Sequence, residues 1–232
     1  MEYLLDTINL ADIKTFTQHM PISGVTSNPS IIKKEGQIDF FSHMNAIRDI
    51  IGDMCSLHIQ VSQKDYPGMM KDAEAILKGV DDQVYIKVPV TMDGVKAIKN
   101  LKAQGIHVTA TAVYLTSQAF IACEAGADYV APYYNRMEAM GIDAGRDIQS
   151  IADCIERYGY KTKILAASFK NVAQINQAIG AGAQAITSAP NLYKDVLTDA
   201  RVADAVEVFC SDWTDIYGNC SIANLKDNKK EM

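Results

Sequence analysis

Lys87 is the one charged residue in an apolar run over 84–90, Val-Tyr-Ile-Lys-Val-Pro-Val, whose composition is typical of a buried strand. Burial disfavours a charged amine, so the pKa of such a lysine falls from about 10.4 toward values at which neutral amine exists at pH 7. A neutral amine is a nucleophile that can form a Schiff base with a carbonyl compound. Taken alone, the run favours a lysine that reaches past the strand end or pairs with a carboxylate. The rest of the chain favours the nucleophile.

Polar side chains stand at or just beyond the carboxyl end of almost every expected strand, after runs that are mainly apolar. They are Asp6, Thr26, Asn28, Gln60, Lys87, Thr111, Tyr133, Arg136, Ser168 and Ser188. Parallel strands that close into a barrel bring their carboxyl ends to one rim, where barrel enzymes build their active sites. The chemical variety of these groups, which includes an amine, a carboxylate and a guanidinium, indicates an active site at that rim.

The elements that must position these groups are short apolar runs that alternate with longer stretches of helical period. The expected strands are 3–6, 24–27, 56–61, 84–88, 107–112, 129–131, 163–167 and 185–188. Alternation of this kind is the pattern of a parallel sheet with crossing helices, and about eight such units close a barrel. We therefore predict an α/β protein with a (β/α)8 TIM barrel.

Capping residues mark the expected helices. Asn9 or Thr7 can cap the first helix, and the glycines that follow later helices and precede strands are Gly105, Gly126, Gly159 and Gly182. A helix that ends before a strand commonly needs a left-handed residue, which glycine adopts without strain. These glycines are therefore predicted to end helices rather than to bind a ligand.

Side chains two positions apart in a strand share a face, which relates several polar residues to one another. If Lys87 points into the barrel, Tyr85 lies one layer below it, and His58 shares a face with Gln60 in the same way. His58 and His107 then become interior residues. We expect both to be hydrogen-bonded core histidines.

The chain is expected to form one domain over residues 1–222, followed by a polar tail over 223–232 that we predict to be frayed. The domain includes an extra C-terminal helix over 202–217, with Val206, Phe209, Cys210, Trp213 and Tyr217 on one face. That face can cap its own barrel or pack on a neighbouring subunit. A homo-oligomer is therefore one expectation.

Composition argues against several classes of function. The net charge is -6, and no stretch rich in Lys and Arg precedes the last few residues, which argues against nucleic acid as a partner. The five cysteines form no CxxC pair and the four histidines no HExxH spacing, so we expect neither a metal nor another cofactor. No signal peptide and no apolar run of membrane-spanning length is recognisable, so we expect a cytoplasmic protein without a membrane partner.

The motifs together resemble the small transaldolase and fructose-6-phosphate aldolase family. The motifs that carry the resemblance are Leu-Leu-Asp-Thr at Asp6, Gly-Val-Thr-Ser-Asn-Pro-Ser over 24–30, Ile-Lys-Val-Pro-Val-Thr at Lys87, Thr-Ala-Val-Tyr at Thr111, Ala-Pro-Tyr-Tyr-Asn-Arg over 131–136 and Ala-Ala-Ser-Phe-Lys over 166–170. They follow the family order from residue 2 to about 222. The resemblance implies a (β/α)8 barrel whose lysine forms a Schiff base with a ketose, and pentameric rings paired into a decamer.

Two positions distinguish the branches of that family. Its transaldolases carry glutamate where this chain has Gln60 and phenylalanine where it has Tyr133, whereas its aldolases carry the residues seen here. The resemblance therefore implies a class I aldolase of carbohydrate metabolism, related to the pentose phosphates, that cleaves or forms fructose 6-phosphate. Its other ligands would be dihydroxyacetone and glyceraldehyde 3-phosphate.

The resemblance also assigns roles to individual residues. It implies that Gln60, Thr111 and Tyr133 hold a water used in proton transfer, and that Asp6 and Asn28 orient substrate hydroxyls. Lys87 would be the electron sink for cleavage of the C3–C4 bond.

The other end of the substrate carries a phosphate, which needs a fixed cation and hydrogen-bond donors. Arg136 offers a bidentate guanidinium and Ser168 a hydroxyl near the last strands, where barrels often bind phosphate. Thr26 and Ser30 complete the predicted substrate site. Lys170 and Ser188 are weaker candidates, because a lysine outside a strand end is usually solvated.

Three alternatives stay open at this point. A transaldolase would use the same enamine but pass the dihydroxyacetone unit to an aldose phosphate. An inert phosphosugar-binding barrel would need only Arg136 and Ser168, with Lys87 idle. A deoxyribose-phosphate aldolase would need a second active-site lysine, which no strand end obviously supplies.

Overall fold

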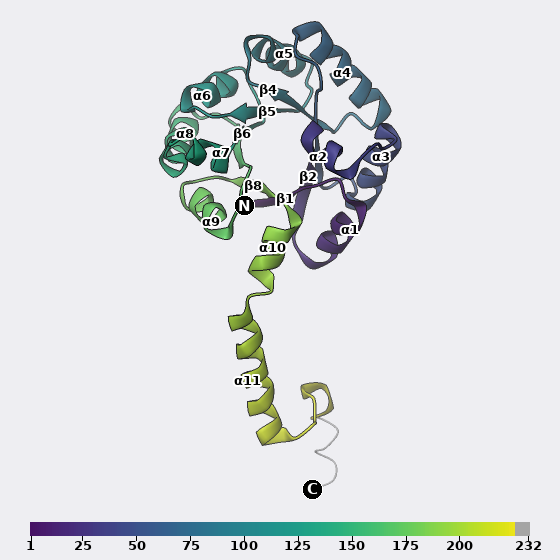
Figure 1. Cartoon of the computed structure of the whole chain (residues 1–232), viewed down its shortest axis with the longest axis vertical. Coiled ribbons are helices and arrows are strands. Elements are labelled where there is room, and N and C mark those ends of the chain that lie inside the picture. The colour runs from purple at the N-terminus through teal and green to yellow at the C-terminus, as the bar shows by residue number, and fades with distance from the viewer. Residues whose placement is uncertain (226–232) are drawn as a thin grey trace. The chain divides into compact units, whose positions relative to one another are not determined.

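The computed structural model describes residues 1–225, in which eight parallel strands form a closed barrel in sequence order. The strands are β1 (Glu2–Asp6), β2 (Ile22–Thr26), β3 (Ser56–Gln60), β4 (Tyr85–Pro89), β5 (Val108–Val113), β6 (Tyr129–Pro132), β7 (Lys163–Ala166) and β8 (Ala185–Ser188). Pairing of β1 with β8 closes the ring, and helices surround it (Figure 1). The predicted (β/α)8 TIM barrel is confirmed.

Helices follow the strands around the barrel. They are α1 (Leu10–His19), α2 (Pro29–Glu35), α3 (Phe40–Ile51), α4 (Tyr66–Gly79), α5 (Met92–Ala103), α6 (Thr116–Glu124), α7 (Tyr134–Ala139), α8 (Ala144–Tyr158), α9 (Val172–Gly180), α10 (Pro190–Leu197) and α11 (Ala200–Tyr217), with a 3₁₀ turn over Ile222–Asn224. The short helices α2 and α7 begin within three residues of β2 and β6 and were not predicted. Both carry residues of the candidate site.

Local sequence explains where these helices begin and end. The side chain of Asn9 accepts a hydrogen bond from the backbone N–H of Asp12 at 3.0 Å and so caps α1, as predicted. Thr7 instead accepts from the N–H of Asn9. At the C-terminal end of α8, Gly159 adopts the predicted left-handed conformation with a φ of 67°.

The interior of the barrel is filled in layers. Leu4, Tyr129, Leu165 and Ala185, from four different strands, pack together, and Tyr85 packs against them. Lys87 comes two residues after Tyr85 on β4 and pairs in register with Gln60. It therefore occupies the next layer toward the carboxyl ends of the strands, as the alternation predicted.

A bulge interrupts the pairing of β5 with β6. Ala110 pairs with Val130 and Val113 with Pro132, so Thr111 and Ala112 together stand opposite Ala131. Ala112 has a φ of 57°, which a residue with a Cβ rarely adopts. The extra residue changes which later side chains face the barrel, because strand alternation has a period of two.

The chain divides into two compact units, Met1–Leu192 and Tyr193–Met232. The first contains the whole barrel. The second contains α11, which covers the predicted extra helix, and residues 226–232 of the predicted tail lie outside the described residues. No helix among the described residues is long and apolar enough to cross a membrane.

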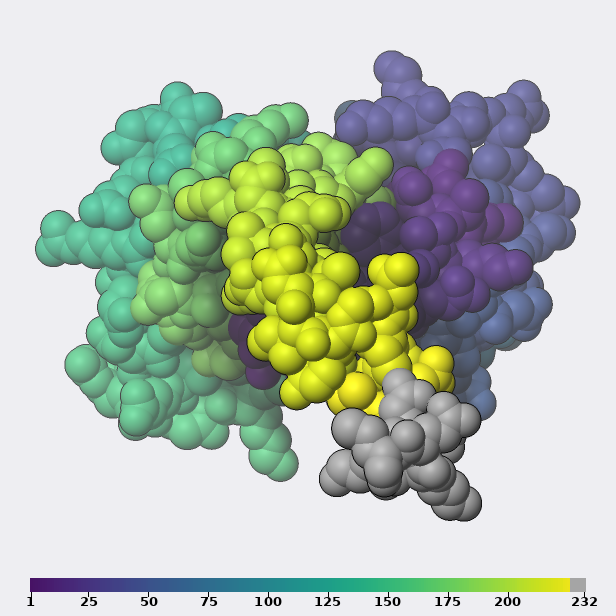
Figure 2. Space-filling model, turned by 90° about the horizontal axis from the view of Figure 1, so that it is seen from below, coloured from purple at the N-terminus to yellow at the C-terminus, as the bar shows by residue number. Residues whose placement is uncertain are grey.

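The second unit, taken by itself, leaves large apolar side chains of α11 exposed. They include Val202, Val206, Phe209, Ile216 and Tyr217. Figure 2 shows the C-terminal segment of the described residues in yellow. Trp213 packs on Tyr217 with ring centroids 4.5 Å apart, and its indole N–H donates to the carbonyl of Cys220 at 2.7 Å. The segment around Trp213 is therefore locally ordered, but no residue of α11 is buried.

Candidate active site

A cavity of about 290 Å³ lies at the carboxyl ends of the barrel strands. It is lined by Asp6, Asn28, Pro29, Ser30, Gln60, Lys87, Ala112, Tyr133, Arg136, Ala167 and Ser168. The residues predicted from strand ends therefore meet in one place, although 162 positions separate the first from the last in sequence. An adjoining pocket of about 360 Å³ shares Pro29 and Gln60 but is lined mainly by apolar groups such as Phe40 and Phe41.

Lys87 extends into this cavity from β4 and is only 4% exposed. Its Nζ donates a hydrogen bond to the carbonyl oxygen of Ser27 at 3.0 Å. Burial lowers the pKa of Lys87 below its usual value of 10.5, and the negative charge of Asp6 opposes that shift. The amine is thus held by a neutral acceptor in surroundings that favour its neutral, nucleophilic form.

Asp6 is fixed by a chain of hydroxyl groups. The Thr26 hydroxyl donates to Asp6 Oδ1 at 2.7 Å, and because its proton is used there, Thr187 donates to Thr26 Oγ at 2.6 Å. Thr26 is fully buried and does not line the cavity. It therefore orients the carboxylate, and a direct contact of Thr26 with substrate stays a prediction.

Tyr133 and Thr111 form a second hydroxyl pair, with 3.0 Å between their oxygens. Burial raises the pKa of Tyr133, so its phenol stays protonated at neutral pH. Thr111 is fully buried and holds Tyr133 from below the cavity surface. The pair can position a water or a substrate hydroxyl without adding a negative charge.

Gln60 lies on β3 next to Lys87, since the two residues pair in register. Its Oε1 is buried and has no hydrogen-bond partner among residues 1–225. A buried acceptor without a partner is costly, which indicates that a ligand or water supplies the donor. Gln60 therefore presents an unsatisfied acceptor to the cavity that it lines.

Arg136 brings a guanidinium to the cavity. Its guanidinium carbon lies 4.7 Å from the centre of the Tyr133 ring, and its Nη1 donates to the hydroxyl of Tyr114 at 3.1 Å. The bond to Tyr114 raises the pKa of Arg136, which stays charged. A stacked and hydrogen-bonded guanidinium is suited to bind an anionic group in one orientation.

Asn28 and Ser30 enter the cavity from the beginning of α2. The Oδ1 of Asn28 accepts from the N–H groups of Ser30 and Ile31 at 3.0 and 3.1 Å and caps the helix. The amide group of Asn28 therefore has only its NH₂ left to offer a substrate. On the far side of the cavity, Ser168 has a φ of 65°, a strained conformation typical of functional positions.

The histidines lie beneath the site and are not part of it. His58 is fully buried, stacks on Tyr85 at 4.6 Å, and bonds to Thr109 and Ser56. Burial lowers its pKa well below 6.5, so it is neutral. His58 is the hydrogen-bonded core residue that was predicted.

His107 departs from that prediction. It stacks on Tyr85 at 4.7 Å, but its buried Nδ1 has no hydrogen-bond partner in the part of the chain that the structure describes and lies 4.0 Å from an oxygen of Asp128. The reason is that Asp128 already accepts short bonds from Lys102 and from the N–H of Val108. A stacked ring with an unsatisfied nitrogen thus replaces the expected bonded one.

The weaker candidates lie outside the cavity. Ser188 is buried with an unpartnered hydroxyl and does not line it, and neither does Lys170, which is exposed. Among the described residues no group of His, Cys, Asp and Glu side chains could hold a metal ion.

Sequence reasoning assigned no role to Ala112 or Tyr114, nor to Pro29 and Ala167, which also line the cavity. Ala112 lines the cavity and Tyr114 holds Arg136. Both follow Thr111 at the bulge, where simple alternation no longer tells which side chain faces the barrel. The signal in the sequence was their place in the motif Thr-Ala-Val-Tyr that begins at Thr111.

Comparison with known proteins agrees with the geometry. The sequence pattern of the family described as Transaldolase/Fructose-6-phosphate aldolase matches residues 3–224. A protein of Streptococcus pneumoniae (strain ATCC 700669 / Spain 23F-1) named "Probable fructose-6-phosphate aldolase" is 47% identical over 222 residues, which cover 96% of this chain and 100% of that protein. The chain is therefore an enzyme of the transaldolase/fructose-6-phosphate aldolase family.

Proposed function

We propose that this enzyme is a class I aldolase that cleaves fructose 6-phosphate to dihydroxyacetone and glyceraldehyde 3-phosphate, and forms it in reverse. The observation that carries the proposal is the buried amine of Lys87, bonded to a neutral carbonyl at the wall of a polar cavity. Burial lowers the pKa of Lys87, which raises the fraction of neutral amine at a given pH. The name of the Streptococcus pneumoniae relative supports the same reaction.

The reaction begins when the neutral amine of Lys87 adds to the C2 carbonyl of the ketose. Loss of water gives a protonated imine, and the C3–C4 bond then breaks with its electron pair passing into the imine to form an enamine. The C4 hydroxyl loses a proton as the aldehyde departs. Protonation of the enamine at C3 and hydrolysis of the imine release dihydroxyacetone and restore the lysine.

Proton transfer falls to the polar groups around the amine. Tyr133, held by Thr111, and Gln60 with its unpartnered oxygen can hold the water that shuttles protons during imine formation and hydrolysis. Asp6 and the water at Tyr133 are the two candidates for the base at the C4 hydroxyl. Asn28 and Ser30 would bind substrate hydroxyls, and Arg136 and Ser168 the phosphate.

The alternative within the family is a transaldolase, which would hand the dihydroxyacetone unit to an aldose phosphate. Gln60 and Tyr133 favour the aldolase, because neutral groups can hold a water that hydrolyses the imine without an acceptor. Incubation of fructose 6-phosphate alone tests the choice. Release of glyceraldehyde 3-phosphate at a useful rate supports the aldolase, and its absence until an aldose phosphate is added supports the transaldolase.

Borohydride trapping tests the Schiff base itself. In the presence of dihydroxyacetone, reduction should add one dihydroxyacetone-derived group, and peptide mass mapping should place it on Lys87. An inert phosphosugar-binding barrel would show no adduct. An adduct on another lysine would contradict the assignment of Lys87.

We also propose that the enzyme acts in the cytoplasm as a homo-oligomer, a pentamer or decamer by resemblance, and that residues 1–222 form one domain. The exposed apolar residues of α11 support assembly, since a large exposed apolar surface usually contacts a partner. Sedimentation of the full chain tests this, and a monomer at micromolar concentration would contradict it.

A further inference from the structure

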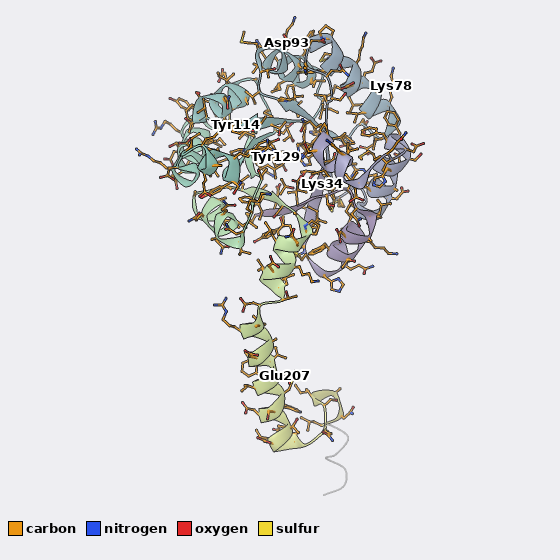
Figure 3. All side chains as sticks on the ribbon, in the orientation of Figure 1. Lys34, Lys78, Asp93, Tyr114, Tyr129 and Glu207 are labelled. Carbon is orange, nitrogen blue, oxygen red and sulfur yellow. The ribbon has the colours of Figure 1, made fainter. Side chains whose placement is uncertain are left out.

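Tyr114 directly follows β5 and contacts Arg136, although no role is predicted for it from the sequence. Its hydroxyl accepts the hydrogen bond from Arg136 Nη1 at 3.1 Å, and its ring meets that of Tyr133 edge to face at 5.6 Å. Figure 3 labels Tyr114 in the region of β5 and β6. Arg136 is thus held between a phenol oxygen on one side and the face of Tyr133 on the other.

The bulge in β5 explains how Tyr114 comes to contact Arg136 and Tyr133, which line the cavity, although Tyr114 is not itself one of the lining residues. Thr109 and Thr111 point into the barrel, so regular alternation would also turn residue 113 inward and residue 114 outward. Ala112 is inserted with a left-handed backbone, and this extra residue reverses the alternation that follows it. Val113 is fully buried and pairs with Pro132. Tyr114 then turns to the side of Tyr133 and Arg136.

The backbone that carries Tyr114 is itself fixed. The side chain of Gln118 accepts hydrogen bonds from the N–H groups of Tyr114 and Leu115 at 2.8 and 3.1 Å. These bonds tie the end of β5 to the first turn of α6. The position of the Tyr114 hydroxyl is therefore set before any ligand arrives, which lowers the entropic cost of using it.

We propose that Tyr114 is a specificity-determining residue that helps bind the phosphate of the substrate. A phenol oxygen that accepts from Arg136 keeps its own proton, which can be donated to a phosphate oxygen next to the guanidinium. Tyr114 thereby both fixes Arg136 and adds a neutral donor to the anion site. This inference rests on the proposed function, in which Arg136 binds the phosphate of glyceraldehyde 3-phosphate.

The test compares acceptors that differ only in the phosphate. In the direction of synthesis with dihydroxyacetone, Tyr114→Phe should raise the KM for glyceraldehyde 3-phosphate about tenfold, the size expected for a hydrogen bond to a charged group. The KM for glyceraldehyde should change less than about twofold. The matched control is Tyr160→Phe, which removes a phenol bonded to Glu124 at 2.6 Å on the surface and should alter neither constant.

Two results would overturn the inference. One is an unchanged KM for glyceraldehyde 3-phosphate in Tyr114→Phe, and the other is an equal rise for both acceptors, which would mean a general structural role. Unchanged turnover of glyceraldehyde by the variant shows that it is folded.

Arg136→Gln separates this inference from the proposed function. If it raises the KM for the phosphorylated acceptor alone while Tyr114→Phe does not, the phosphate site stands and the role of Tyr114 is wrong. If the parent enzyme makes no fructose 6-phosphate, calorimetric titration with glycerol 3-phosphate and with glycerol still tests the site. Binding of glycerol 3-phosphate that Tyr114→Phe weakens about tenfold supports the inference, and binding equal in parent and variant refutes it.

Discussion

The amine of Lys87 lies 3.0 Å from the carbonyl oxygen of Ser27, to which it donates a hydrogen bond. Ser27 in turn follows β2, and its N–H donates to the carbonyl of His58 on β3. The amine is therefore anchored to the backbone of the barrel and not to a carboxylate. A neutral acceptor orients the lysine without stabilising its charge as an ion pair would, so the amine stays reactive.

Replacing Lys87 by methionine should abolish turnover, because the nucleophile is lost. It should also raise the free energy of unfolding at pH 7 by about 1–3 kcal/mol, because a buried amine is removed from a site that disfavours its charge. The folded pKa of Lys87 is lowered, so the unfolded chain binds more protons between that pKa and 10.5. The variant's gain in free energy of unfolding should be largest below the pKa of Lys87 in the folded protein. It should disappear as the pH rises toward 10.5. Urea unfolding of parent and variant across pH measures it, and a gain that grows with pH would contradict the burial argument.

The same lowered pKa predicts the pH dependence of catalysis. For the free enzyme, kcat/KM should rise with pH as Lys87 loses its proton, with a midpoint below 10.5. Initial rates of fructose 6-phosphate cleavage across a pH series provide the measurement. A rising limb centred at or above 10.5 would show an amine that the protein has not perturbed.

Gln60→Glu combined with Tyr133→Phe should shift the enzyme from cleavage toward transfer. The phenol that holds the water would be lost and a negative charge added beside Lys87, so hydrolysis of the imine should slow more than transfer to an acceptor. The ratio of the rates with and without erythrose 4-phosphate measures the shift. Equal cleavage without acceptor by parent and double variant would refute the branch assignment.

Asp6→Asn distinguishes the two candidate bases. If the carboxylate removes the proton of the C4 hydroxyl, kcat should fall by roughly 10²–10⁴. Thr26→Val keeps the carboxylate of Asp6 but removes the 2.7 Å hydrogen bond that Thr26 donates to it. The fall in kcat caused by Thr26→Val should therefore be much smaller. A loss below about tenfold in Asp6→Asn would leave the water at Tyr133 as the base.

The left-handed backbone of Ala112 predicts an unequal response to substitution. Ala112→Gly should change the free energy of unfolding by less than about 1 kcal/mol, since relief of strain offsets the greater freedom of glycine when unfolded. Ala112→Val should destabilise by about 1–3 kcal/mol, because a β-branched residue strongly resists a φ of 57°. Ala11→Val, at an exposed position of α1, controls for the added methyl groups. Equal effects at residues 11 and 112 would show that the bulge bears no strain.

The sequence alone determined the barrel and most of the site. Alternating apolar runs and helical stretches identified the strands, because burial imposes a period that composition reveals. Polar residues at the ends of those runs, such as Asp6, Gln60 and Lys87, could then be expected to lie close together. The carboxyl ends of parallel strands in a closed barrel form one rim, and these residues line one cavity there. Even the anomaly of one amine in an apolar strand was visible before the fold was known.

Only the tertiary structure decided how those residues contact one another. It placed Thr26 and Thr111 beneath the cavity as supports for Asp6 and Tyr133, which the order of residues along the strands does not reveal. It also brought Tyr114 to Arg136, because one inserted residue at Ala112 reverses the alternation on which sequence reasoning depends. Side-chain direction after a bulge depends on the pairing of two strands, and that pairing exists only in the folded barrel.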